Sequence, residues 1–399
     1  MENDKISFNQ TYRRLSVFYL LFFLGIGSLY PLLSSYYFFN GMSGKQIGVL
    51  MSIGPIIAII SQPIWGMICD RYGIQKKVLF VTLISSAAIA FFFPITTSYL
   101  ILILLSAGIA VFQSAVIPIS DNISMNFVQT TGGNYGNIRL WGSIGFAVAV
   151  WIAGNLADFF HIQIIFYLYS GALILAALLT KSLPDDGSQL SVEVFKGIRQ
   201  LFKIPTFTLF LVGTFLLFGT MNANNTYFSI YFQEIGGTLS GVGLAFLLAA
   251  GSEAPVMMMV KRLVDKFGLM PLILFATIVS AIRWYLYSTG PSTFLVLATS
   301  FTQGLSIGIY LPAAVQFVRE IAPKDVQVTA MSLYGSFGLG LGSLISVILS
   351  GVFYDLFGSL AIYKYYMISA LLALVVFSII YYIERAKKLQ IKQTNLLKK

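Results

Sequence analysis

Long stretches of this 399-residue chain contain no Asp, Glu, Lys or Arg. Residues 15–44, 46–69 and 78–120 are three of them, and each is long enough for at least one helix of the about 20 apolar residues that cross a bilayer. Only 10% of all residues are charged, whereas an ordinary soluble domain carries about 25%. So few charges cannot cover a surface that faces water. The chain is therefore expected to lie in a membrane, and a soluble enzyme is excluded.

The pattern predicts an all-α membrane protein with twelve transmembrane helices in two six-helix bundles. The run 78–120 is divided at Pro94–Ser98, so it holds two spans. The predicted spans are roughly 15–38, 46–68, 78–96, 99–127, 138–157, 162–180, 206–232, 241–260, 270–288, 293–318, 328–352 and 362–383. The longest polar stretch, 181–205, is interpreted as a cytoplasmic linker. It separates an N-terminal bundle, 1–180, from a C-terminal bundle with a basic tail, 206–399.

The basic residues predict the orientation of the chain. With the N-terminus in the cytoplasm, only Lys45 and Lys364 of the 25 lysines and arginines fall outside, and only Arg283 lies within a span. Cytoplasmic loops of membrane proteins carry such an excess of Lys and Arg. We therefore expect a multi-pass protein of the cell membrane with both termini in the cytoplasm. The net charge of +10 is explained by this topology, and no nucleic-acid partner is expected.

Three short patterns recur in the same order in both halves. They are Asp70–Gly73 with Asp265–Gly268, Gly142–Gly145 with Gly335–Gly338, and Gly154–Asp158 with Gly351–Asp355. Their nearly constant spacing indicates a duplicated half. Duplicated helical halves are typical of secondary transporters, in which one half moves against the other around a site at mid-membrane.

The stretch 66–77 resembles the signature of the loop between helices 2 and 3 in the major facilitator superfamily. The matching positions include Gly66, Asp70, Arg71 and Gly73, and the segment with Asp265 and Gly268 resembles a weaker second copy. The resemblance implies the twelve-helix fold of that superfamily and a gating role for these six residues. Gly66 is expected to allow close helix contact. The alternative is a plain anchor loop that only fixes the topology.

Four ionisable residues lie within or at the ends of predicted spans: Asp121, Arg139, Glu253 and Arg283. Such groups are costly in a bilayer and are functional by default. Asp121 and Arg139 are symmetric about a tight loop near residue 130, so they reach the same depth and are expected to pair. The alternatives are a purely structural ion pair, or an Arg139 side chain that extends to the lipid headgroups.

The motif from Arg139 to Phe146 resembles helix 5 of the sugar, nucleoside and phenylpropionate proton symporters, the branch that includes lactose permease. The resemblance implies that Asp121 and Arg139 hold the solute, with Ser143 beside them and Phe146 stacked on a sugar ring. By helix number alone, Glu253 and Arg283 match the acid and arginine of the second half of that permease. They are therefore assigned to proton coupling, with Asp121 as a further candidate. This chain has no histidine in span 10 and no acid in span 7, so the resemblance does not imply that lactose is the solute.

Neutral polar and aromatic residues complete the predicted solute site. Asn222 and Asn225 lie on one helical face of span 7, where their amides can bind hydroxyl groups. Tyr310 is included among the solute-binding residues. Further aromatic candidates for the lining of the pocket are Tyr19, Tyr30, Trp65 and Tyr227.

The sequence thus predicts a secondary active transporter that takes up a small polar organic solute, such as a sugar, oligosaccharide or nucleoside, together with protons. Its expected partners are the solute, the proton and the bilayer, and a monomer is expected. With one histidine and one cysteine, neither a metal site nor a cofactor is expected. The absence of a phosphate-binding loop excludes an ATP-driven pump within this chain. The alternatives are uptake of an aromatic carboxylate, drug efflux, or a membrane sensor that transports nothing.

Overall fold

The computed structural model describes residues 2–131, 133–184 and 198–397, without the side chains of residues 2–8, 70, 325, 328 and 387–397. By packing, the chain divides into two units. The first comprises Met1–Ser191 and Thr226–Leu247, and the second comprises Val192–Asn225 and Leu248–Lys399. The central part of the expected linker, residues 185–197, lies outside the described residues. The expected boundaries of the two bundles stay a prediction.

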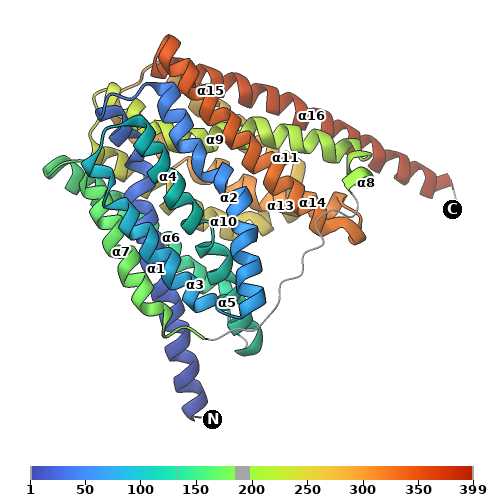
Figure 1. Cartoon of the computed structure of the whole chain (residues 1–399). Helices are drawn as coiled ribbons and strands as arrows, with labels where there is room; N and C mark the ends of the chain where they lie inside the picture. The colour runs from blue at the N-terminus through green and yellow to red at the C-terminus, as the bar shows by residue number, and fades with distance from the viewer. Residues whose placement is uncertain (1, 132, 185–197, 398–399) are drawn as a thin grey trace. The chain divides into compact units, whose positions relative to one another are not determined.

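The first unit contains seven helices and a short 3-10 turn from the N-terminal part of the chain (Figure 1). They are α1 (Glu2–Phe39), α2 (Gly44–Tyr72), α3 (Gln75–Ala90), η1 (Phe93–Ile95), α4 (Tyr99–Gln113), α5 (Val116–Thr131), α6 (Tyr135–Phe159) and α7 (Ile164–Thr180). Pro94 lies in η1, so the chain turns there between two spans, as predicted.

The remaining helices follow residue 197. They are α8 (Ile198–Phe202), α9 (Pro205–Glu234), α10 (Leu239–Phe267), α11 (Leu269–Ser288), α12 (Thr293–Ser300), the π-helical η2 (Gly304–Gly308), α13 (Ile309–Ile321), η3 (Lys324–Val326), α14 (Gln327–Leu333), the π-helical η4 (Tyr334–Leu341), α15 (Gly342–Phe357) and α16 (Ser359–Leu397). The last part of α9 and the first part of α10 belong to the first unit.

Eleven helical segments of the described chain are long and apolar enough to cross a membrane. The segment expected as the sixth span, α7, is equally apolar but has 17 residues. α4 and α5 together form one span, Tyr99–Thr131, and α12, η2 and α13 form another, Thr293–Ile321. The prediction of an all-α membrane protein is confirmed. The largest differences from the expected limits are at the start of the first span and at the end of α10. The first span begins at Asn9, where residue 15 is expected, and α10 ends at Phe267, where residue 260 is expected.

Glycine ends the helix at two corresponding places. The N–H of Gly73 donates to the carbonyl of Cys69 at the end of α2, and the N–H of Gly268 donates to Val264 at the end of α10, each over 2.8 Å. Both glycines have a positive φ, +61° and +84°, which disfavours any residue with a Cβ. In both copies of the loop motif, the helix therefore ends at a glycine with a positive φ that bonds the carbonyl four residues earlier, as expected for duplicated halves.

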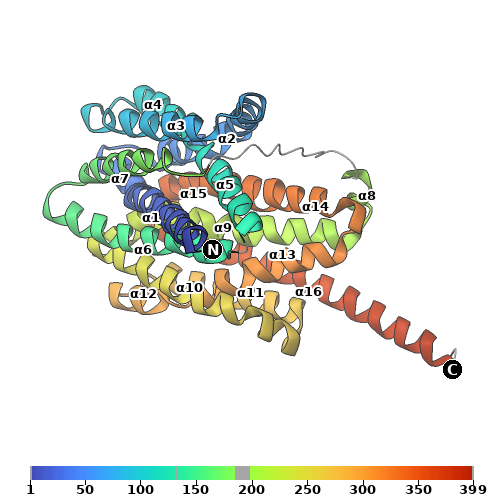
Figure 2. The same ribbon diagram turned by 90° about the horizontal axis from the view of Figure 1, so that it is seen from below.

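The core of the first unit forms where α1 packs between α6 and α7 (Figure 2). Two glycines bring α1 and α6 into backbone contact, and a third makes room for a side chain. A Cβ on Gly27 would lie 2.5 Å from the carbonyl oxygen of Phe146, and one on Gly145 would lie 2.3 Å from that of Leu20. A Cβ on Gly142 would lie 2.8 Å from the ring of Phe23. Small residues that let helix backbones approach are typical of contacts between membrane helices.

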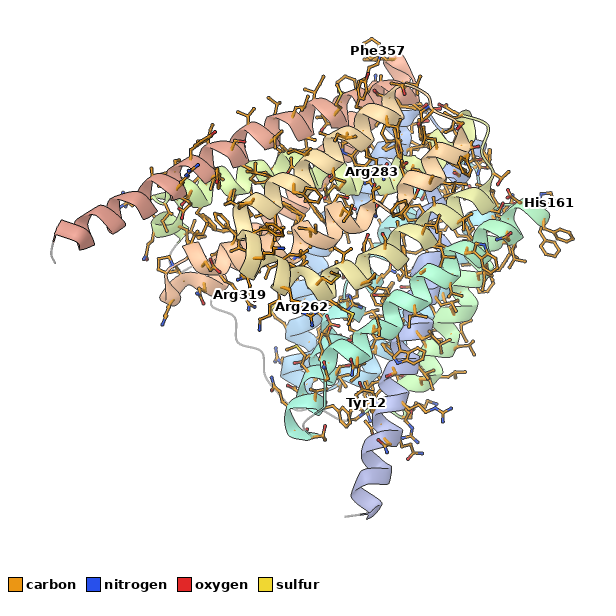
Figure 3. The ribbon with its side chains drawn as sticks, turned by 180° about the vertical axis from the view of Figure 1, so that it is seen from behind. Tyr12, His161, Arg262, Arg283, Arg319 and Phe357 are labelled. Carbon is orange, nitrogen blue, oxygen red and sulfur yellow. The ribbon has the colours of Figure 1, made fainter. Side chains whose placement is uncertain are left out.

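In the second unit, α11 packs along α16. The interface is an aromatic cluster in which the ring of Trp284 lies 5.8 Å from Tyr363 and 5.6 Å from Tyr366. Figure 3 shows Arg262 and Arg319 towards one end of this unit and Phe357 at the opposite end. The same view places Arg283 between these two ends, among the helices.

Candidate functional site

The first cluster of charged residues lies where α1, α5 and α6 meet. The hydroxyl of Tyr19 on α1 donates a hydrogen bond of 2.5 Å to Oδ1 of Asp121 on α5. The guanidinium of Arg139 on α6 lies 4.4 Å from the ring centroid of Phe23 and 5.4 Å from that of Tyr19. An acid, a cation and two aromatic rings are therefore gathered at one place in the first unit.

The glycines of α6 explain how Arg139 reaches these rings. Gly142 and Gly145 lie three and six residues after Arg139, on the face of α6 that contacts α1. Because Gly142 packs against the ring of Phe23 itself, that ring is held beneath the guanidinium. A cation over an aromatic face is stabilised by the ring quadrupole, by about 0.5–2 kcal/mol. The glycines of the helix 5 motif thus position the charged residue that precedes them.

The expected direct pair of Asp121 and Arg139 is not formed. Within the described residues no ion pair joins them, and Tyr19 contacts both: its hydroxyl bonds the acid and its ring faces the cation. The physical reason is that α1 packs against α6 closely enough to insert its side chains near both charges. Sequence reasoning named Tyr19 only as a general aromatic candidate, and it missed Phe23. The sequence signal for Phe23 is its position four residues after Tyr19, about one helical turn along the first span.

The other two predicted residues of the helix 5 motif differ in exposure. Ser143 is exposed, whereas Phe146 is half-buried and its backbone contacts Gly27 on α1. Their assignment to solute binding stays a prediction.

The second charged cluster lies in the second unit. Nη1 of Arg283 on α11 donates to Oε1 of Gln303 over 3.1 Å, and Nε2 of the same Gln303 donates to Oε1 of Glu253 on α10 over 3.0 Å. The sequence associates Glu253 with Arg283, and in the described chain they are joined through Gln303 without an ion pair between them. Gln303 carries no role in the sequence prediction, and its signal there is an amide within a predicted span that has no charged residue.

The amides of α9 occupy different environments. Asn222 is exposed and donates to Ser343 over 2.9 Å. Asn225 is half-buried, and its Oδ1 has no hydrogen-bond partner among the residues that the structure describes. Asn224, on another face, is buried and accepts a hydrogen bond from Tyr363. The unsatisfied acceptor of Asn225 is consistent with the predicted polar face, whose role in solute binding stays a prediction.

Tyr310 is fully buried, and its hydroxyl donates to Thr214 over 2.7 Å. Its ring packs against Phe218 and Phe377. In this conformation Tyr310 supports the core of the second unit, and its assignment to solute binding stays a prediction.

The other aromatic candidates of the first unit are also occupied within the protein. Tyr227 is buried and donates to the carbonyl of Gly44, and Trp65 donates to that of Val111. Tyr30 donates to Gln113, whose Nε2 is buried and has no partner in the described part of the chain.

The gating-loop residues are placed at the ends of α2 and α10. A Cβ on Gly66 would meet nothing within 4 Å, so the expected close helix contact is absent at this glycine in this conformation. Arg71 and Asp265 are exposed, and the side chain of Asp70 lies outside the described residues. Their gating role stays a prediction. Among the described residues, no group of three or more His, Cys, Asp or Glu side chains is placed to hold a metal ion.

Comparison with known proteins decides the family. The model of the MFS_1 like family matches residues 12–365. The chain belongs to this family. It is 40% identical over 362 residues to a maltose permease of Geobacillus stearothermophilus, which covers 90% of this chain and 92% of the permease. It is 38% identical over 379 residues to the uncharacterized transporter YwbF of Bacillus subtilis, covering 94% of each chain.

A solved structure shares the fold. The MFS_1 like chain superposes on a variant of the nucleoside transporter NupG with a TM-score of 0.85 at 17% identity, covering 93% of this chain and all of that one. At this identity the likeness shows the fold alone. Together with the family, it makes the chain a multi-pass membrane transporter of the major facilitator type, and not an enzyme.

Proposed function

We propose that the protein takes up a sugar or oligosaccharide in symport with protons, by alternating access. The observation that carries this proposal is the cluster of Asp121, Tyr19, Arg139 and Phe23. Sugar hydroxyls both donate and accept hydrogen bonds. A carboxylate accepts them and a guanidinium donates them, and bonds to such charged groups are the stronger ones. The ring of Phe23 adds an apolar face of the kind that packs against the C–H groups of a sugar ring.

The charge balance of this cluster favours a neutral solute over an anion. A carboxylate bound at Arg139 would come near Asp121, and like charges in a medium of low dielectric repel strongly. The name of the maltose permease, a relative at 40% identity over most of both chains, supports a sugar as well. Nucleoside uptake is the second candidate, because the amides of Asn222 and Asn225 are also able to bind a base.

Glu253 is assigned the transported proton in this proposal. It is half-buried on α10, inside a membrane span, and Gln303 links it to the buried Arg283. The duplicated loop motifs, with Asp70 and Asp265, are assigned to control of the cytoplasmic side. Both termini lie in the cytoplasm, which the distribution of the 25 lysines and arginines supports.

The test is uptake by proteoliposomes with an imposed inward proton gradient. Radiolabelled maltose, uridine and phenylpropionate are compared in one panel. We expect accumulation of maltose that collapses when a protonophore is added. Glu253→Gln should lose accumulation and keep downhill exchange, because glutamine mimics the protonated acid. Glu320→Gln is the matched control, since Glu320 is exposed and bonds only Gln316 among the contacts described.

The other outcomes overturn parts of the proposal. If uridine or phenylpropionate accumulates and maltose does not, the substrate is a nucleoside or an aromatic carboxylate and not a sugar. If maltose accumulates to the same level without a proton gradient, transport is not coupled to protons. A folded Glu253→Gln protein that still accumulates maltose would move the proton to Asp121. For orientation, protease cleavage within 181–205 from outside intact cells would reverse the proposed topology.

A further inference from the structure

The amide of Gln303 is held between opposite charges in the second unit. Gln303 is 9% exposed and Arg283 is 4% exposed, so both lie in the protein interior. The amide oxygen accepts from Nη1 of Arg283 over 3.1 Å, and the amide nitrogen donates to the carboxylate of Glu253 over 3.0 Å. A guanidinium offers only donors and an ionised carboxylate only acceptors. The two charges therefore fix the direction of the amide as long as Glu253 is ionised.

Within the described part of the chain, Arg283 makes one hydrogen bond, to Gln303. Its Nε and Nη2 atoms are buried without a partner among the residues that the structure describes. Its guanidinium lies 4.5 Å from the ring centroid of Trp284, which is also buried. A buried cation without a balancing anion is strongly destabilising. Arg283 is supported electrostatically by the phenols of Tyr287 and Tyr363 and by the carboxylate of Glu253, to which Gln303 links it.

The backbone around Gln303 is shaped to make this contact. Gln303 directly precedes the π-helix η2, and such π-bulges occur frequently at functional sites. The next residue, Gly304, lies so close to α10 that a Cβ would be 2.4 Å from the carbonyl oxygen of Ser252, the neighbour of Glu253. The N–H of Gly304 also donates to the hydroxyl of Ser252 over 3.0 Å. These contacts hold the amide against Glu253.

We propose that Gln303 is a positioning residue that couples the protonation of Glu253 to Arg283. This deepens the proposed proton symport and rests on the assignment of the proton to Glu253. When Glu253 is ionised, the amide is locked in one direction and links acid to cation. When Glu253 is protonated, its O–H becomes a donor, the amide is no longer fixed, and Arg283 loses its balancing charge. Gln303 does not itself titrate, but it links the protonation of Glu253 on α10 to the environment of Arg283 on α11.

Two tyrosines also lie near the guanidinium of Arg283. Tyr287 on α11 and Tyr363 on α16 act on Arg283 electrostatically. Glu253 is the carboxylic acid of this cluster, with Gln303 and Arg283 as its partners on the elements packed against it.

The experiment follows Glu253 directly by infrared spectroscopy of the purified protein. The carboxylic-acid C=O band that is absent in Glu253→Gln is assigned to Glu253 and titrated with pH. Gln303→Met keeps the size of the side chain and removes both hydrogen bonds. Because hydrogen bonds to an ionised group favour that form, we expect the band to persist to a pH about one unit higher or more in this variant.

A second variant and a matched control make the result decisive. Gln303→Glu places another acid beside Glu253, and we expect a larger upward displacement of the band. Gln316→Met, at an exposed glutamine of α13, should leave the titration unchanged. A Gln303→Met or Gln303→Glu protein that titrates like the wild type would overturn the relay. Because the titration needs no solute, a wild-type protein that fails to accumulate maltose counts against the proposed function and not against the relay.

Discussion

The hydroxyl of Tyr19 lies 2.5 Å from Oδ1 of Asp121, so α1 supplies the hydrogen-bond donor for the acid of the proposed solute site. The same ring lies under Arg139. A neutral side chain therefore separates acid from arginine in the first unit, as Gln303 separates them in the second. In both clusters the charged groups keep hydrogen-bonding capacity that a direct ion pair would use up.

Tyr19→Phe should weaken maltose binding about tenfold or more while the protein stays folded. The ring remains under Arg139, but the carboxylate of Asp121 loses its donor, and a hydrogen bond to a charged group is worth about 1.5–3 kcal/mol. Binding is measured by calorimetry on purified protein. Tyr382→Phe, at an exposed tyrosine of α16, is the control and should bind like the wild type. If Tyr19→Phe binds maltose with unchanged affinity, this hydroxyl is not part of the solute site.

Asp121→Asn and Arg139→Gln should each abolish measurable binding. Each substitution leaves the opposite charge without compensation in the span, and each removes the strongest donor or acceptor offered to a sugar hydroxyl. Arg139→Lys should also fail, since an ammonium lacks the planar fork of the guanidinium. The measurement is equilibrium binding at matched expression. Folded variants that bind maltose normally would place the site elsewhere.

Gly145→Ala should destabilise the protein and lower its solute affinity. The added Cβ would lie 2.3 Å from the carbonyl oxygen of Leu20, so α1 must move away from α6 and Phe23 from Arg139. Overpacking of this kind typically costs about 1–3 kcal/mol. Thermal unfolding of the purified protein reports the loss. Gly171→Ala is the matched control, because nothing lies within 4 Å of its Cβ position. Equal unfolding midpoints for the two variants would contradict the backbone contact.

Asp158→Asn should loosen the contact of α6 with the start of α10. The carboxylate of Asp158 accepts from the N–H groups of Leu239 and Ser240 over 3.0 and 2.7 Å, so it caps that helix from another one. Asparagine keeps one acceptor and loses the charge that favours a helix N-terminus. We expect a maleimide that cannot cross the membrane to react several-fold faster with Ser240→Cys in a Cys69→Ser background.

The control for this prediction is Asn155→Ala, one turn earlier on α6. The side chain of Asn155 is exposed and bonds only the carbonyl of Trp151 among the contacts described, so its loss should leave the labelling rate unchanged. Equal rates for Asp158→Asn and the parent protein would show that the cap does not restrain α10.

The sequence by itself determined the spans, their order and their ends. Charge-free runs are a local property, and any run of that length must cross the bilayer or be buried. Gly73 and Gly268 end their helices because only glycine adopts a positive φ without strain. This preference belongs to the residue itself and does not depend on distant segments. The charged residues of the candidate site were equally visible, because a charge within an apolar run stands out without any knowledge of its neighbours.

Only the tertiary structure decided what lies between those charges. A membrane helix is apolar on nearly every side, so its sequence does not reveal which face meets a neighbouring helix. Tyr19 reaches Asp121 and Arg139 because glycines allow α1 and α6 to touch, and Gln303 reaches Glu253 because Gly304 lies against Ser252. The rotation of α13 about its axis, which the sequence does not reveal, places Tyr310 in the core, where its hydroxyl donates to Thr214. Contacts between distant segments depend on how helices rotate and pack, and that packing is a property of the whole fold.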